Sequence, residues 1–220
     1  MISLKLNTIS YFIAKYDIDG HFLRQKVISS IMFYEQGHST IDIGGTFFCD
    51  LNGNLYISGQ YQYMIKFEKD SFLSRYNTYR PGKSPLVAYG RFFARFDSNF
   101  RLSSFKATSS RHLETPSSPG IYGAAAFPLL QFAGISPDQK YFYLSANFRD
   151  TFDLDDTMMV AKGNSDFALL KYDTAGNRIW VRYIGGDYED YTLASNVGPD
   201  GTLYVGGAYS YDCRFGNLSL

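Results

Sequence analysis

The sequence predicts an all-β fold, and three observations support this prediction. The chain of 220 residues contains 19 tyrosines and 19 phenylalanines, and aromatic residues favour the pleated, half-buried surface of β-strands. No segment carries a convincing helical pattern longer than a turn or two. Two short phrases, each typical of a β-hairpin, recur in three units along the chain.

The first phrase combines apolar residues, a cation, an aromatic residue and an aspartate. Its copies end at Asp17, Asp97 and Asp173, which are 80 (97 minus 17) and 76 (173 minus 97) residues apart. A segment rich in Asp, Asn and Gly follows each aspartate, and apolar residues resume beyond it. Each copy therefore predicts a β-hairpin whose turn begins at the aspartate.

The second phrase has a core of tyrosine, an aliphatic residue, two small residues, any residue and an aromatic residue. Its copies begin at Tyr56, Tyr143 and Tyr204, and turn-forming residues precede each one. Small residues in the middle of a strand indicate a place where neighbouring backbone comes close. Each unit thus contributes two hairpins, so that four strands are expected per unit.

Four-stranded sheets at a fixed period are typical of the blades of a β-propeller. We therefore expect one repeat domain over residues 1–220, with about three antiparallel blades of four strands. The approximate blade boundaries are 1–88, 89–160 and 161–220. Two loop-rich insertions, at 68–90 and 109–123, are expected to project from the rims of the blades.

Three blades are too few to close a propeller, because known rings need at least about four. Three alternatives follow. The chain is a piece of a longer repeat protein, or two chains associate head to tail into a six-bladed ring, or the chain is an open stack of three blades with masked edges.

Several segments of the third unit carry a family resemblance. These are F-A-L-L-K-Y-D-T-A-G-N-x-x-W, the Gly185-Gly186 pair, D-G-T-L-Y-V-G-G-x-Y and Phe215-Gly216. Together they resemble the bacterial SBBP-type β-propeller repeat. In the first unit Arg24 stands at the tryptophan position, and the second unit lacks both the tryptophan and the turn glycines. The resemblance implies a propeller in an exported or cell-surface protein, and it transfers no catalytic residue.

The balance of charges gives no reason to expect a nucleic-acid or membrane partner. Lysine and arginine balance aspartate and glutamate at 21 each, which gives no global attraction to nucleic acid or to an anionic membrane. The N-terminus lacks the pattern of a signal peptide, and no apolar stretch is long enough to span a bilayer. Cys49 and Cys213 form no disulfide framework and no metal motif, so free thiols are expected, with one disulfide as the alternative.

Two pairs of tyrosines are candidates for ligand binding. Tyr61 with Tyr63, and Tyr209 with Tyr211, are two residues apart, so each pair is expected to share one face of its strand. Such rows stack on sugar rings or peptides. The alternative is that they pack between adjacent blades, with their hydroxyl groups at the blade edge.

A run of acidic residues is the candidate metal site. Its members are Asp150, Asp153, Asp155 and Asp156. Carboxylate oxygens suit calcium, but the run lacks the ordered spacing of a calcium-binding loop, so a solvated surface is the competing interpretation. Asp50, Asn52 and Asn54 also resemble part of a calcium loop, and turn chemistry explains them better. No other cofactor is expected.

These observations favour a non-catalytic propeller module that binds a protein or carbohydrate ligand. The first alternative is a glycan hydrolase or lyase on a propeller scaffold, for which Asp42 and Asp190 are the only repeated acids. None of the three histidines has a second ligand at metal-binding spacing, and no nucleophile-elbow or phosphate-loop motif is present. The second alternative is a purely structural spacer.

Overall fold

The chain folds into antiparallel β-sheets. The computed structural model describes residues 7–32, 47–62, 64–67, 70–73, 89–109, 130–148, 151–154, 157–216 and 218–219. In these residues there are 18 strands and no helix, which confirms the all-β prediction. The strands form four sheets, which we number 1 to 4 from the N-terminus.

Sheet 1 has the strand order β1-β2-β5-β6, and sheet 4 consists of β15 and β16 alone. The strands of sheet 1 are β1 (Asn7–Tyr16), β2 (Phe22–Met32), β5 (Met64–Phe67) and β6 (Asp70–Leu73). Those of sheet 4 are β15 (Asp190–Val197) and β16 (Leu203–Tyr209).

Sheets 2 and 3 have six strands each, in the orders β12-β11-β8-β7-β4-β3 and β18-β17-β14-β13-β10-β9. The strands of sheet 2 are β3 (Phe47–Cys49), β4 (Leu55–Gln62), β7 (Tyr89–Phe96), β8 (Leu102–Ser109), β11 (Thr151–Leu154) and β12 (Thr157–Val160). Those of sheet 3 are β9 (Leu130–Ile135), β10 (Tyr141–Phe148), β13 (Asp166–Asp173), β14 (Arg178–Gly185), β17 (Arg214–Phe215) and β18 (Leu218–Ser219).

The sheets do not coincide with the sequence units 1–88, 89–160 and 161–220. In the first two units, the second hairpin pairs with the first hairpin of the next unit, so that β4 lies beside β7 and β10 lies beside β13. After β4 the chain returns to sheet 1 and adds the short hairpin β5–β6 there, before it continues to β7. The short hairpins β11–β12 and β17–β18 extend sheets 2 and 3 in the same way, which is why these sheets have six strands rather than the expected four.

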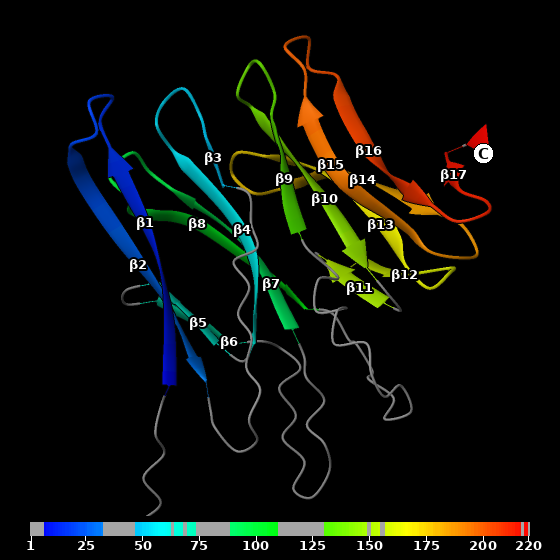
Figure 1. The fold of residues 1–220 in the computed structure, drawn as a ribbon, viewed down its shortest axis with the longest axis horizontal. Helices are drawn as coiled ribbons and strands as arrows, with labels where there is room; N and C mark the ends of the chain where they lie inside the picture. Colours follow the sequence, from blue (N-terminus) through cyan, green and yellow to red (C-terminus); the bar gives the residue numbers. More distant parts are fainter. Residues whose placement is uncertain are drawn as a thin grey trace, which may run out of the picture.

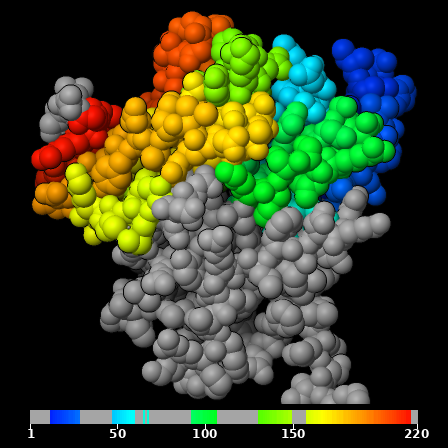
Figure 2. Space-filling view, turned by 180° about the vertical axis from the view of Figure 1, so that it is seen from behind, coloured from blue at the N-terminus to red at the C-terminus, as the bar shows by residue number. Residues whose placement is uncertain are grey.

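The sheets stack face to face in chain order, as Figure 1 shows from β1 at one side to β16 and β17 at the other. In Figure 2 the described residues run from blue at one side of the view to red at the other. Successive side chains of a strand point to opposite faces. Phe92, Ala94 and Phe96 of β7 therefore pack toward sheet 1, while Phe93 packs toward sheet 3, and all four are buried. Burial on both faces explains why Phe92, Phe93 and Ala94 are consecutive apolar residues.

Three apolar cores formed by described residues lie between the successive sheets. The core between sheets 1 and 2 contains Ile28, Leu55, Ile57, Ile65, Phe67, Phe92, Ala94, Phe96 and Phe100. The core between sheets 2 and 3 contains Tyr56, Phe93, Leu130, Phe132, Phe142, Leu144, Ala146, Phe148, Met159, Ala168, Leu170 and Tyr172. The core between sheets 3 and 4 contains Phe167, Ile184 and Cys213. Full burial of one such large side chain stabilises the fold by about 1.5–3 kcal/mol.

The smaller core between sheets 3 and 4 is supplemented by polar contacts. The amide nitrogen of the Asn147 side chain donates to the carbonyl oxygen of Thr192 at 3.0 Å, and the Thr192 N–H donates to Asn147 Oδ1 at 2.8 Å. Both residues are buried, so neither bond is exposed to competing water. These paired bonds fix sheet 4 against sheet 3.

The aspartate of the first phrase organises the hairpin turn in all three units, as predicted. Asp17 Oδ1 accepts the N–H groups of Asp19 at 3.0 Å and His21 at 2.8 Å. Asp97 makes the two equivalent bonds in the second unit. In the third, Asp173 accepts from the backbone and the side chain of Asn177. The side chain thus satisfies backbone donors that the tight turn leaves without a strand partner.

The fourth residue of each hairpin turn has a positive φ, both in the three turns of the first phrase and in the three of the second. Glycine occupies the position in four of these six turns, at Gly20, Gly53, Gly176 and Gly201. Phe100, at 60°, and Gln139, at 57°, adopt the same conformation with a side chain. A left-handed conformation costs a residue with a Cβ about 1–2 kcal/mol, so these two turns are strained copies of the glycine turns.

Gly20→Ala isolates this backbone cost, because a Cβ at Gly20 would meet no atom within 4 Å. We expect the substitution to lower the free energy of unfolding by about 1 kcal/mol. Gln139→Gly should raise it by a smaller amount, because it also removes the 3.3 Å bond from the Leu51 N–H to Gln139 Oε1. Urea denaturation measures both changes.

Gly206→Ala is the matched control, because its Cβ also meets nothing within 4 Å and its φ is not positive. This substitution should leave the stability unchanged or raise it slightly. Equal losses at Gly20 and Gly206 would show that the turn conformation is not the cause.

Candidate functional site

Three loops meet where sheets 3 and 4 end, on the side away from the hairpin turns at 173–177 and 198–202. We call them the corner loops, and they comprise residues 161–165, 186–189 and 210–213. The N–H of Asn164 donates to the Tyr188 carbonyl oxygen at 2.9 Å, and the N–H of Asp190 donates to the Ser165 carbonyl oxygen at 2.8 Å. Gly186 lies directly against the carbonyl oxygen of Asp212, where a side chain would not fit.

The corner loops present two tyrosines to solvent. The rings of Tyr188 and Tyr211 are 4.5 Å apart between centroids and are inclined by 39°. Tyr188 is partly exposed, and 84% of Tyr211 is exposed. The two rings therefore form an aromatic platform, Tyr188–Tyr211, which is accessible to a ligand.

The backbone of Tyr211 is strained, because its φ is 65°. This conformation costs a non-glycine residue about 1–3 kcal/mol and persists where the surrounding structure holds it. Here the Asp212 N–H donates to the Ser210 carbonyl oxygen at 2.9 Å, and Cys213 beyond it is fully buried. A strained residue with an exposed ring is typical of a functional position, since packing does not explain the ring's placement.

A buried carboxylate supports the corner loops from below. Asp166, at the start of β13, accepts the N–H of Lys162 at 2.6 Å and also the hydroxyl group of Tyr183. Burial, followed by this bond to Asp166, raises the pKa of Tyr183. Gly185 packs directly on the Asp166 carboxylate, and a Cβ there would collide with it. Close approach of Asp166 thus accounts for the first glycine of the Gly185-Gly186 pair.

A second buried carboxylate joins the loop at 186–189 to β15. Asp190 Oδ2 accepts the N–H of Gly186 at 2.6 Å. Burial raises the pKa of Asp190, the charge of Asp166 adds to this, and the bond from Gly186 opposes it. Burial together with the charge of Asp190 raises the pKa of Cys213 to about 11. The thiol is therefore protonated at neutral pH and acts as part of the core.

The raised pKa of Asp190 predicts a specific pH dependence of stability. Below the ordinary value of 3.8 the carboxyl group is protonated in both states, so its burial carries no charge penalty. As the pH rises through the folded-state pKa, the folded protein must ionise a buried group, and stability is lost. The free energy of unfolding, relative to that of Asp190→Asn, should fall as the pH rises above the ordinary value of 3.8.

Asp17→Asn provides a control of opposite sign. Hydrogen bonds, the largest from the His21 N–H, lower the pKa of Asp17, so the wild-type advantage at this position should grow as the pH rises. Urea unfolding at each pH measures both differences. A stability difference for Asp190→Asn that does not change with pH would contradict the assignment.

The three predicted ligand-binding tyrosines that the structure describes lie at different positions in the fold. Tyr209 is the last residue of β16 and is half-exposed. Tyr211 lies beyond the end of the strand, so the expectation that it shares a strand face with Tyr209 is wrong; the positive φ of Tyr211 breaks the alternation. Tyr61 belongs to β4, and Tyr63 lies outside the described residues.

Sequence reasoning missed Tyr188, because no repeated phrase contains it. A tyrosine between Asp187 and Glu189 lies in a loop, where an apolar ring is not needed for packing, and this could have marked it as a candidate for ligand binding. It also missed Asp166, whose equivalents in the first two units are Ser10 and Gly90. The buried support of the corner loops is therefore specific to the third unit.

The predicted calcium site is largely outside the described residues, which exclude Asp150, Asp155 and Asp156. Asp153 belongs to β11 and pairs with Met158 and Ser109. Asp50 is buried, and its Oδ1 accepts the N–H groups of Asn52 at 2.9 Å and Asn54 at 2.8 Å, as turn chemistry predicts.

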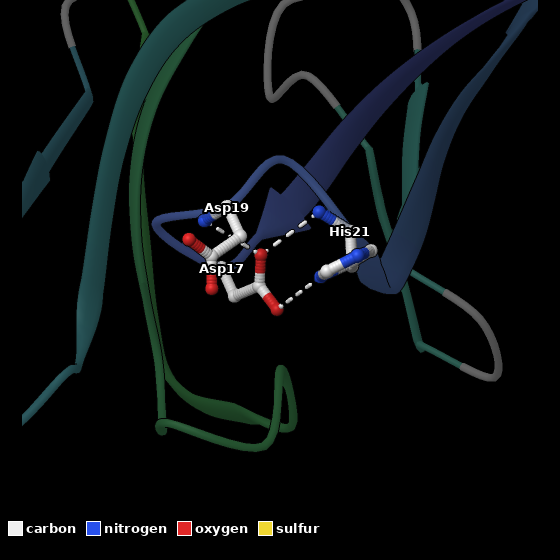
Figure 3. A network of polar contacts seen from close by, with 3 residues as sticks. All are labelled: Asp17, Asp19 and His21. Atoms are coloured by element: carbon white, nitrogen blue, oxygen red, sulfur yellow. Dashed lines mark hydrogen bonds and ion pairs between the residues drawn. The ribbon is translucent and has the colours of Figure 1, made fainter.

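Within the described part of the chain, Asp17, Asp19 and His21 form one group of side chains that could ligate a metal ion (Figure 3). Their ligand atoms lie within 4.8 Å of one another, and all three residues are exposed. Asp17 Oδ2 contacts His21 Nδ1 at 3.0 Å, while its Oδ1 accepts two backbone N–H groups. Since Asp97 and Asp173 make the same turn without a histidine, turn formation explains this cluster.

Both cysteines are free thiols, as expected; Cys49 is exposed and Cys213 is buried. Asp190, which the enzymatic alternative nominated, is fully buried, and Asp42 lies outside the described residues. A substrate therefore has no access to Asp190 in this conformation.

No protein-family model and no curated protein sequence matches this chain. Within the described residues, no helix is long and apolar enough to cross a membrane.

Proposed function

We propose that the chain is a non-catalytic, β-propeller-type repeat module that binds a ligand through the Tyr188–Tyr211 platform. Stacked antiparallel sheets give the platform a rigid base, and the SBBP-like phrases of the third unit favour a bacterial secreted or surface protein. The exposed, strained Tyr211 beside Tyr188 is the observation that carries the proposal.

A carbohydrate suits this platform best. Two inclined rings that are 4.5 Å apart offer an aromatic surface to the C–H groups of a sugar ring. Asp187 and Glu189 flank Tyr188 in the sequence and both are exposed, and carboxylates accept hydrogen bonds from hydroxyl groups such as those of a sugar. Because the same two acids repel anions, we expect a neutral or amino sugar rather than an acidic one.

The ordering of the platform favours binding over a purely structural role. Asp166 and Asp190 fix the loops before the ligand arrives, so that less conformational entropy is lost on binding. A spacer would have no need to hold Tyr211 in a costly conformation with its ring in solvent.

Tyr211→Gly tests the binding role and the strain together. We expect it to weaken glycan binding by about tenfold or more, because half of the aromatic surface is lost. The same change should raise the free energy of unfolding by about 1 kcal/mol, because glycine adopts a positive φ without strain. A glycan array followed by calorimetry measures binding, and urea denaturation measures stability.

Tyr204→Ala is the matched control, since Tyr204 is also an exposed tyrosine but lies on the face of β16, away from the corner loops. It should leave glycan binding unchanged. If the platform bound a peptide and no glycan, the proposal of a carbohydrate ligand would be wrong. If Tyr211→Gly and Tyr204→Ala had the same effect on binding, the platform would be ruled out as the site.

A further inference from the structure

The first and last sheets are complementary halves of one complete sheet. Sheets 2 and 3 each combine a second-phrase hairpin, a first-phrase hairpin and a short hairpin, in that order. Among the residues that the structure describes, sheet 4 has only the second-phrase hairpin, and sheet 1 has only the first-phrase hairpin and a short hairpin. Placed side by side, β15-β16 and β1-β2-β5-β6 reproduce the six-stranded order of sheets 2 and 3.

The strands at which the two halves would join are both edges in the described part of the chain. β7 and β13 pair on both sides, whereas β1 pairs only with β2. β4 and β10 likewise pair on both sides, whereas β16 pairs only with β15. An open edge presents unpaired N–H and carbonyl groups that favour pairing with another strand.

The outer face of sheet 1 has the residues of a buried interface. Phe12 and Tyr16 lie at the positions that Phe92 and Phe96 occupy in sheet 2, at a spacing of 80 residues (92 minus 12). Phe92 is 0% exposed, but Phe12 is 73% exposed. Leu23 and Val27 of β2 are exposed beside them. In sheets 2 and 3, the corresponding face is buried by the sheet that precedes it.

The outer face of sheet 4 shows the same mismatch at the other end. Tyr204 lies at the position of Tyr56, at a spacing of 148 residues (204 minus 56). Tyr56 is 1% exposed and packs against Phe132 and Phe142 of sheet 3, whereas Tyr204 is 61% exposed. Leu193 of β15 is also exposed. An apolar face at each end therefore lacks a cover in the described residues.

A cation–π contact recurs at the junction between the two hairpins of a sheet. In sheet 2 the guanidinium of Arg95 lies 5.7 Å from the centroid of the Tyr56 ring. In sheet 3, Lys171 Nζ lies 5.5 Å from the centroid of the Tyr143 ring. Lys15 and Tyr204 are the corresponding residues of sheets 1 and 4, and both are exposed. The two chain ends thus hold the separated members of a third such pair.

A second cation–π contact recurs between successive sheets. Lys26 of sheet 1 lies 5.6 Å from the Phe96 ring of sheet 2, and Lys106 of sheet 2 lies 5.4 Å from the Tyr172 ring of sheet 3. The residues at the next repeat of this contact are Arg182 of sheet 3 and Tyr16 of sheet 1 in a second copy of the chain. Both residues are exposed.

We propose that two copies of this chain associate head to tail, with β16 of each copy paired antiparallel to β1 of the other. In the joined sheet, the outer face of sheet 1 lies against sheet 3 of the other copy, and the outer face of sheet 4 lies against sheet 2 of the other copy. Two such junctions close a ring of six complete sheets, a number typical of propellers. The contact is heterologous, because the surface at one end of the chain meets the different surface at the other end.

The interior junctions fix the register of this pairing. Tyr56 lies opposite Arg95, and Tyr143 lies opposite Lys171. Both place Tyr204 opposite Lys15 of the second copy. By the same rule Gly206 lies opposite Ile13, because Ser58 pairs with Phe93 and Ser145 pairs with Leu169. Two independent junctions therefore predict one register.

Sedimentation equilibrium of the chain tests the association. We expect a dimer for the wild type and for Tyr211→Gly. Tyr204→Ala and Lys15→Glu should each weaken the association by about tenfold or more, because they remove the cation–π contact in a desolvated site. Phe12 is largely exposed in the single chain, so Phe12→Lys should fold and remain monomeric. Circular dichroism confirms that each variant is folded.

Disulfide cross-linking tests the register. In a Cys49→Ser background, Gly206→Cys with Ile13→Cys should form a covalent dimer on oxidation, because directly opposite residues lie within disulfide reach. Gly206→Cys with Gln25→Cys is the control. Gln25 lies one strand further away, at about 10 Å, which is beyond disulfide reach.

The outcomes separate the candidate covers of the end faces. A dimer with the in-register cross-link supports the proposal. A strictly monomeric wild type without the cross-link overturns it and leaves the faces to a flanking segment of a longer chain. Equal cross-linking of the two cysteine pairs overturns the register. Because Tyr211→Gly and Tyr204→Ala affect different measurements, failure of this proposal is distinguishable from failure of glycan binding.

Discussion

Burial of both faces of each interior sheet is the constraint on which the rest of this structure depends. A sheet with two apolar faces is stable only between two neighbours, so each sheet requires one before it and one after it. Phe92 and Phe93 show the principle: they are adjacent in sequence, and each enters a different core. The stack, the exposed end faces and the need for a cover at both ends all follow from this one requirement.

The same constraint separates residues of architecture from candidates for function. Side chains that recur at equivalent positions, such as the turn aspartates and the tyrosines of the second phrase, are explained by turns and by packing between sheets. Tyr188 and Tyr211 have no such explanation, because both are exposed, their rings contact each other rather than a core, and Tyr211 has a strained backbone. Function is therefore inferred where the units differ, and assembly is inferred where they agree.

Local features of the fold could be predicted from the sequence, whereas the sheet partners could not. Asp97 and the residues after it specify a turn by local hydrogen bonds, so the hairpins were predicted correctly. Pairing of β4 with β7 instead of β2 is a nonlocal choice, and the apolar pattern of these strands is compatible with both. At the candidate site, Tyr211 was found but its orientation was wrong, because strand alternation gives no warning of a positive φ.

Amide hydrogen exchange on the whole chain, read strand by strand, tests the stacked arrangement most directly. β7 and β13 pair on both edges and are buried on both faces, so their amides should exchange most slowly. β3 and β12 are the edge strands of sheet 2 and should exchange much faster, although they belong to the same sheet as β7. Equal protection of β7 and β3, or fast exchange in β13, would contradict a stack of sheets with doubly buried central strands.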